Sequence, residues 1–217
     1  SLISIAYGGG KMPVPVIERA LTLFPGVNFT NAYGLTETSS TIALLDPDDH
    51  RAAIDHDDTA VRARLGSVGK PLPSIEIEVR DEDGRQVGPF ESGEIYVRGS
   101  QVSGEYDGRS VLDADGWFPT RDAGYVDNDG YLFLSGRADD VIVRGGENIS
   151  PGEIEDLLHQ HEAIADTAAV GIPSEEWGEV VALTVVVATG QSITEDEIRS
   201  HIRDCLLYTS DAADDSL

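Results

Sequence analysis

The feature that most constrains the fold is the hydrophobic pattern, whose period changes twice along the 217 residues of the chain. Residues 2–7 form a short apolar run, and an amphipathic segment that opens with prolines, residues 13–24, follows it. A second apolar run, VNFTNAY, comes next. This order of strand, helix and strand predicts the last crossover of an α/β sheet. The acidic stretch 46–64 has no clear period, and we expect a charged, mobile loop there.

Alternating apolar residues replace this pattern from Gly66 onwards. The segments SIEIEVR and GEIYVRG alternate, and DNDG marks a hairpin turn. These short strands predict a small, distorted β-barrel. After Arg137 the pattern changes again, because helices opened by Ser150 and Thr194 accompany a valine-rich strand. This last part predicts a small α+β unit.

We therefore expect an α/β plus α+β fold in two domains. The larger domain covers residues 1–138, with an α/β portion at 1–45 and the barrel at 66–138. An incomplete small domain covers residues 139–206. The last stretch, 207–217, has neither an amphipathic period nor turn residues, and we expect it to be a non-native tail.

The charge balance argues against several classes of partner. The chain carries 40 Asp and Glu against 15 Lys and Arg, a formal net charge of −25. A field of this sign repels the phosphates of nucleic acids and anionic membranes, so we expect neither as a partner. The single cysteine, Cys205, allows no intrachain disulfide and fits a reducing, cytoplasmic location. No apolar run reaches the length of a membrane span.

Three weaker signals have simpler explanations. YGGGKMP resembles a phosphate-binding loop, but Met12 stands where that loop needs Ser or Thr to hold magnesium. His159 and His161 lie two residues apart on an expected helix and do not share a face, so we expect solvated side chains rather than metal ligands. The carboxylates of residues 46–58 are expected to form a solvated loop rather than a divalent-ion site.

Polar residues at strand ends and in turns are the candidates for chemistry, because sites are usually built there. They are Asn31, Tyr33, Thr36, Glu37, Asp122, Arg137 and Asp139. Each alone also has a structural explanation. Thr36 or Thr38 can cap a turn, Asp122 can cap the turn before Gly124, and Arg137 can form a surface ion pair.

Taken together, these residues describe a nucleotide site. The Tyr33 ring can lie on a purine while Asn31 reads the edge of the base. The Thr36 hydroxyl can donate to a phosphate oxygen, and the Glu37 carboxylate is a hard ligand for magnesium. Asp122 can accept from both hydroxyls of a ribose, with an arginine as an additional donor on the same sugar.

Four motifs follow one another in the order found in the adenylate-forming (AMP-binding) superfamily. They are NAYGLTE, GEIYVRG, DGWFPTRDAGYVDNDGYLFLSGRADDVI and GGENISPGEIE. The chain resembles this superfamily, which includes acyl- and aryl-CoA ligases, peptide-synthetase adenylation domains and luciferases, from Ile3 to about Cys205. GGENISPGEIE and the later EEWGE look most like the acyl-CoA ligase branch.

The resemblance implies a role for each matching residue of the first motifs. Gly9 lies in the glycine turn that matches the loop bordering the adenylate. Asn31 and Tyr33 match the adenine contacts. Thr36 matches the phosphate-binding threonine, and Glu37 matches the magnesium ligand.

Later motifs imply the remaining contacts of the nucleotide. Asp122 matches the ribose-binding aspartate and Arg137 the ribose-binding arginine. Arg121 departs from the pattern, because most members have glycine there, and it places a cation near the phosphates. Asp139 matches the hinge about which the small domain turns.

The small domain is implied to bind CoA. Gly145, Gly146 and Glu147 match the loop that enters the site for thioester formation. Trp177 matches a position that contacts CoA in some aryl-CoA ligases.

The implied activity is that of an AMP-forming acid–thiol ligase, an acyl-CoA synthetase that uses ATP, Mg²⁺, CoA and a carboxylic acid. The family's phosphate loop would lie upstream of these residues. Its catalytic lysine belongs to the small domain, and neither of the two lysines of the chain, Lys11 and Lys70, lies there. We therefore expect a fragment, truncated at both ends and inactive by itself. Two alternatives stay open: an adenylation domain that loads a carrier protein, and a non-catalytic nucleotide-binding module. The acid and the oligomeric state are left open.

Overall fold

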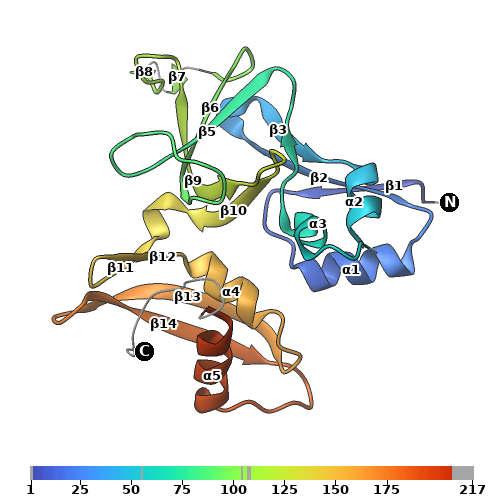
Figure 1. Ribbon diagram of the computed structural model, residues 1–217, viewed down its shortest axis with the longest axis vertical. Helices are drawn as coiled ribbons and strands as arrows, with labels where there is room; N and C mark the ends of the chain where they lie inside the picture. The colour runs from blue at the N-terminus through green and yellow to red at the C-terminus, as the bar shows by residue number, and fades with distance from the viewer. Residues whose placement is uncertain (1, 55, 104, 107–108, 207–217) are drawn as a thin grey trace. The chain divides into compact units, whose positions relative to one another are not determined.

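The structure is a computed structural model that describes residues 2–54, 56–103, 105–106 and 109–206 (Figure 1). The chain divides into two compact units, Ser1–Asp139 and Asp140–Leu217. The expected tail lies outside the described residues. No helix of the described part combines the length and the apolar character that a membrane span requires.

The first sheet of the first unit contains the expected crossover. Strands β1 (Ser4–Gly8) and β2 (Asn28–Leu35) are parallel, and helix α1 (Val14–Leu23) connects them. Strands β3 (Ser40–Leu45) and β4 (Lys70–Pro71) complete the order β1-β2-β3-β4 with antiparallel pairing. The strand–helix–strand prediction is therefore confirmed.

The acidic stretch 46–64 is helical, so the expectation of a loop was wrong. It forms α2 (Pro47–Ile54) and α3 (Thr59–Ala63). The Asp46 carboxylate accepts hydrogen bonds from two backbone N–H groups in the first turn of α2, each at 2.8 Å. His50 is fully buried on the inner side of this helix. An aspartate cap followed by proline is a start signal for a helix, and the surrounding charges obscured it.

The strand-rich part of the first unit is a second sheet (Figure 1). It contains β5 (Ile75–Arg80), β6 (Gly93–Gly99), β9 (Phe118–Val126) and β10 (Leu132–Arg137). All pairs are antiparallel, in the order β10-β9-β6-β5. Among the described strands, β10 and β5 do not pair, so the expected barrel is an open sheet. Four strands are too few to close a barrel around packed side chains.

Both sheets of the first unit share one hydrophobic core. Its buried members are Tyr33, Ile42, Ala43, Ile75, Val79, Ile95, Val97, Phe118 and Leu132. A two-stranded ribbon, β7 (Glu105–Tyr106) and β8 (Arg109–Ser110), lies between β6 and β9 in the sequence. The 3₁₀ turn η2 (Arg64–Gly66) follows α3 and carries the buried Leu65.

The second unit is an antiparallel sheet with two helices. Its strands, in spatial order, are β12 (Glu147–Ile149), β11 (Ile142–Arg144), β14 (Gly178–Val187) and β13 (Ile164–Ser174). The helices are α4 (Pro151–Leu158) and α5 (Glu195–Leu206). Thr194 caps α5 as expected, because its hydroxyl accepts from the Glu197 N–H at 3.3 Å while the Glu197 carboxylate accepts from the Thr194 N–H at 2.8 Å. With these two units, the expected fold class is confirmed.

Candidate functional site

The carboxyl ends of the two parallel strands carry the first group of candidate residues. Gly9 follows β1, and the 3₁₀ turn η1 (Thr36–Thr38) follows β2. Because β1 and β2 are parallel, these segments lie at the same edge of the sheet, where ligands bind in open α/β sheets. Gly9 has a φ of +76°, and a Cβ added to it would meet no atom within 4 Å. This edge is therefore open beside Gly9.

The turn after β2 is shaped by Gly34 and Thr38. A Cβ on Gly34 would lie 1.9 Å from the carbonyl oxygen of Ser40, so only glycine fits there. The fully buried Thr38 hydroxyl accepts from the Leu35 N–H at 3.0 Å and lies 2.8 Å from the Ser40 carbonyl oxygen. The capping role considered for Thr36 or Thr38 thus falls to Thr38. Thr36 is exposed, which leaves its hydroxyl accessible to a ligand.

Glu37 is half-buried beside this turn, and its backbone carbonyl accepts from the Ser103 N–H at 2.7 Å. In the described part of the chain, no three His, Cys, Asp or Glu side chains gather where they could hold a metal. Magnesium is commonly bound by one or two carboxylates together with the phosphates of a substrate. A single carboxylate such as Glu37 fits that mode and does not form a site by itself.

Tyr33, Asp122 and Arg137 form a contacting cluster of candidate residues. The Tyr33 hydroxyl donates to Asp122 Oδ2 at 2.6 Å, and Arg137 Nη1 donates to Asp122 Oδ1 at 2.7 Å. Tyr33 is 8% exposed and Asp122 is 9% exposed, whereas Arg137 is exposed. Burial, and then the nearby Asp122 charge, raise the pKa of Tyr33 far above its usual range. Tyr33 therefore stays protonated and acts as a donor to the carboxylate.

A bulge in β9 aims Asp122 toward this cluster. The register of β9 against β6 shifts between Glu94 and Tyr96, which leaves extra residues on β9. The buried Thr120 hydroxyl donates to the Ile95 carbonyl at 2.8 Å and accepts from the Asp122 N–H at 3.1 Å. Bulges beside active sites often re-aim a side chain in this way. The sequence reasoning missed Thr120, whose only signal was its position two residues before Asp122.

Two candidate residues lie apart from the cluster. The Asn31 side chain donates to the Ser67 carbonyl oxygen at 3.2 Å, at the end of η2. Asp139 is exposed and belongs to the 3₁₀ turn η3 (Ala138–Asp140), at the last position of the first unit. Their assignments as an adenine contact and a hinge stay predictions.

The second unit brings together most of the candidate CoA contacts. Gly145 and Gly146, with φ of +60° and +92°, form the two-residue turn between Arg144 and Glu147. Positive φ at both central residues is typical of the tightest hairpin turns. The Gly145 N–H donates to the Trp177 carbonyl at 2.8 Å, and a Cβ on Gly145 would lie 3.0 Å from the indole ring. The Arg144 guanidinium lies 5.0 Å from the centre of the same ring, a contact that the sequence reasoning missed.

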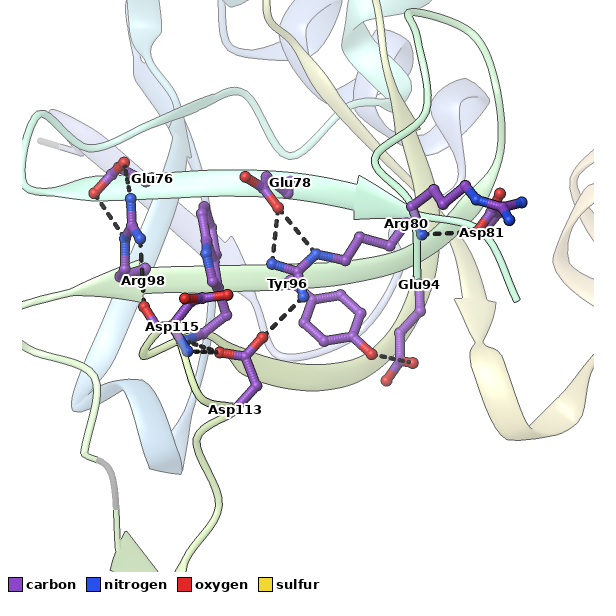
Figure 2. Close-up of polar contacts among 11 residues, drawn as sticks. Glu76, Glu78, Arg80, Asp81, Glu94, Tyr96, Arg98, Asp113 and Asp115 are labelled. Atoms are coloured by element: carbon purple, nitrogen blue, oxygen red, sulfur yellow. Dashed lines mark hydrogen bonds and ion pairs between the residues drawn. The ribbon is translucent and has the colours of Figure 1, made fainter. Parts of the chain in front are cut away.

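The outer face of the second sheet carries a different polar cluster, shown in Figure 2. Arg80 pairs with Glu78 at 2.8 Å and with Asp113 at 2.9 Å. Its guanidinium lies 4.3 Å from the centre of the Tyr96 ring and 5.2 Å from that of the buried Trp117. The guanidinium is thus held by two carboxylates and two rings, and these contacts stabilise this face of the sheet.

Comparison with known proteins identifies two matching regions. Residues 1–107 match the AMP-binding enzyme family, and residues 153–208 match the AMP-binding enzyme C-terminal domain. The 2-succinylbenzoate–CoA ligase of Bacillus cereus (strain AH820) is 38% identical over 202 residues, which are 91% of this chain and 39% of that protein. That of Geobacillus sp. (strain WCH70) is 37% identical over 196 residues, 88% of this chain and 37% of the relative. The chain thus spans about two fifths of the length of these relatives.

Solved structures share the fold. The amide bond synthetase McbA from Marinactinospora thermotolerans matches with a TM-score of 0.82 and 33% identity over 94% of this chain and 40% of its own. The o-succinylbenzoate CoA synthetase MenE from Bacillus subtilis, in complex with the acyl-adenylate intermediate OSB-AMP, matches with a TM-score of 0.75 and 34% identity over 93% of this chain and 39% of its own. As its motifs predicted, the chain belongs to the AMP-binding, adenylate-forming enzyme family.

Proposed function

We propose that this chain is part of an ATP-dependent acid–CoA ligase, which activates a carboxylic acid as an acyl-adenylate and transfers it to CoA. The observation that carries the proposal is the Asp122 carboxylate, held by Tyr33 and Arg137 beside a β-bulge. The similarity to 2-succinylbenzoate–CoA ligases supports it and makes 2-succinylbenzoate the first acid to test. The cytoplasm is the proposed location.

Asp122 is proposed to bind the ribose of ATP. Each of its carboxylate oxygens has one protein donor, and a carboxylate oxygen has lone pairs for two. Asp122 can therefore keep its contacts with Tyr33 and Arg137 while it accepts from the two ribose hydroxyls. The exposed Arg137 guanidinium offers further N–H donors to the same sugar.

The edge formed by Gly9 and η1 is proposed to bind the phosphates. The Thr36 hydroxyl would donate to a phosphate oxygen, and backbone near Gly9 would border the adenylate. Glu37 would supply one oxygen ligand to magnesium, whose charge offsets that of the phosphates. These assignments rest on the motifs and on the shared sheet edge.

The reaction needs no nucleophile from the protein. A substrate carboxylate oxygen attacks the α-phosphorus, the bond to the bridging oxygen breaks, and pyrophosphate leaves. The CoA thiolate then attacks the acyl carbonyl carbon and AMP leaves. The residues above act by holding the reactants in line and by stabilising charge on the phosphoryl oxygens. The proposed contacts of CoA are Gly145, Gly146, Glu147 and Trp177. Asp139 is proposed as the hinge about which the second unit turns from one half-reaction to the next.

A second candidate function is amide formation, in which an amine replaces the CoA thiol as the acceptor. The similarity to the amide bond synthetase McbA, 33% identical over 94% of this chain, is the reason to keep it. Both functions share the adenylate-forming half-reaction. They differ in the acceptor alone, so one assay with both acceptors separates them.

The test is a chimera in which this chain replaces the 202 matched residues of the Bacillus cereus relative. We expect pyrophosphate release with ATP, magnesium and 2-succinylbenzoate, followed by thioester formation with CoA. Asp122→Ala should lower the adenylation rate about 10²-fold because ATP loses its positioning through the ribose, whereas Asp115→Ala on the outer face should not. A folded chimera that releases no pyrophosphate with any of a panel of carboxylic acids would refute the proposal. The 217-residue chain by itself is expected to make no acyl-CoA.

A further inference from the structure

Arg121, next to the candidate ribose ligand, has an unusual backbone conformation. It lies in the β9 bulge with a φ of +62°, the left-handed region that glycine adopts without strain and other residues rarely visit. Its side chain is 59% exposed, so burial does not hold it there. A strained, exposed residue in a bulge requires a local interaction that favours it.

Two carboxylates face the Arg121 guanidinium. Arg121 Nη1 lies 3.5 Å from Asp139 Oδ1, and Arg121 Nε lies 3.9 Å from Glu94 Oε1. Glu94 Oε1 is buried and has no hydrogen-bond partner in the described part of the chain, while Glu94 Oε2 accepts from the Tyr96 hydroxyl at 3.3 Å. A buried carboxylate oxygen without a hydrogen-bond donor destabilises the folded state. Glu94 therefore attracts the Arg121 guanidinium toward the sheet.

Asp139 lies at the point where the chain leaves the first unit. The boundary between the two compact units falls between Asp139 and Asp140, within η3. Two residues earlier, Arg137 pairs with Asp122 at 2.7 Å. Two neighbouring residues of β9 therefore form ion pairs with this segment. Arg121 pairs with Asp139, and Asp122 pairs with Arg137.

We propose that Arg121 is a positioning residue that restrains the joint between the two units by pairing with Asp139. The bulge sets its backbone, Glu94 orients its guanidinium, and the ion pair holds η3 against β9. Opening of η3 must break this pair, so Arg121 lowers the population of open conformations at residues 138–141. The restraint stands on these contacts, and only its consequence for catalysis rests on the proposed function.

The test is hydrogen exchange of the 217-residue chain, followed by mass spectrometry at the backbone amides of residues 138–141. Arg121→Gly should speed exchange there roughly two- to fivefold, the factor that one exposed ion pair supplies. Global stability should not fall, because glycine adopts the same φ without strain. Arg121→Lys keeps the charge and should retain part of the protection. Arg85→Gly removes another exposed arginine, paired with Asp83, and should leave this joint unchanged.

Two further comparisons make the result specific. Asp139→Asn removes the pair from its other end, and the double variant with Arg121→Gly should show no additional effect. At about 1 M salt the difference between Arg121→Gly and the parent should shrink, because both partners are exposed. Unchanged exchange in Arg121→Gly and Asp139→Asn, or a difference equally large at high salt, would overturn the proposal.

The consequence for catalysis is tested separately in the chimera. Arg121→Gly should change the rate of the CoA-dependent step by a larger factor than the rate of pyrophosphate release. Faster exchange at residues 138–141 without this kinetic difference would leave the restraint in place and refute the hinge in the proposed function. A chimera without any activity would refute the proposed function, and the exchange result would still decide the role of Arg121.

Discussion

Replacing Tyr33 with phenylalanine tests the cluster on which the proposed nucleotide site depends. The ring keeps its place in the shared core, and only the hydroxyl that donates to Asp122 Oδ2 at 2.6 Å is lost. Asp122 is 9% exposed, so water replaces that donor poorly. The variant therefore isolates one hydrogen bond to a buried carboxylate.

The expected loss of stability is sizeable. A hydrogen bond to a charged group contributes about 1.5–3 kcal/mol, and leaving a buried acceptor unpaired removes that contribution. With a urea m-value of about 2 kcal/mol per M, Tyr33→Phe should lower the unfolding midpoint of the first unit by about 1 M. Tyr96→Phe is the matched control, because its hydroxyl reaches Glu94 at 3.3 Å from a half-buried position. It should cost less than about 1 kcal/mol.

The two tryptophans of the chain allow the units to be followed separately. Trp117 is buried in the first unit, and Trp177 lies in the second. In a Trp177→Phe background, urea unfolding monitored by fluorescence reports on the first unit alone. A double-mutant cycle with Asp122→Asn then measures the coupling, and the cost of Tyr33→Phe should fall below about 1 kcal/mol in that background. Equal midpoints for Tyr33→Phe and Tyr96→Phe would refute the reasoning.

Three other changes have defined outcomes. Arg80→Met should destabilise the first unit by about 1–2 kcal/mol, because two ion pairs and two ring contacts are lost. The control Arg85→Met should change the unfolding free energy by no more than about 0.5 kcal/mol, and similar urea midpoints for the two variants would contradict this. Burial lowers the pKa of His50 below its ordinary value of 6.5, so the unfolded chain takes up the proton first as the pH falls. The contribution of His50 to the unfolding free energy is fully present above pH 6.5 and is lost as the pH falls through the folded-state pKa. Between pH 7 and pH 5, the unfolding free energy of His50→Gln should therefore fall less than that of the parent chain. Gly145→Ala adds a Cβ 3.0 Å from an indole carbon at a φ of +60°, and a thermal melt should show the second unit destabilised by about 1 kcal/mol or more. Gly146→Ala should cost less, because its added Cβ meets no atom within 4 Å.

Periodicity and turn residues predicted most elements of the fold. The crossover β1–α1–β2, the alternating strands and the helix capped by Thr194 were confirmed, because each has a strong local signal. Two kinds of element were missed. Helix α2 was hidden by charge although Asp46 and Pro47 mark its start, and β13 (Ile164–Ser174) was missed because its small and polar residues give a weak alternating pattern.

The site was less accessible to sequence reasoning than the fold. Tyr33 and Asp122 are 89 residues apart, so no local pattern predicts their hydrogen bond, and the family motifs alone suggested that they belong together. Thr120 and the bulge depend on the register between β9 and β6, which the side-chain pattern does not specify to the single residue. The departure at Arg121 was visible in the sequence, but its positive φ was not.

The core shared by both sheets makes the candidate site a reporter of folding cooperativity. Tyr33 comes from one sheet and Asp122 from the other, and their hydrogen bond bridges elements that pack on the same buried side chains. A ligand that binds only when this pair is intact must stabilise both sheets together, by thermodynamic linkage. A nucleotide bound at the proposed site should therefore raise the unfolding free energy of residues 1–139 as one unit.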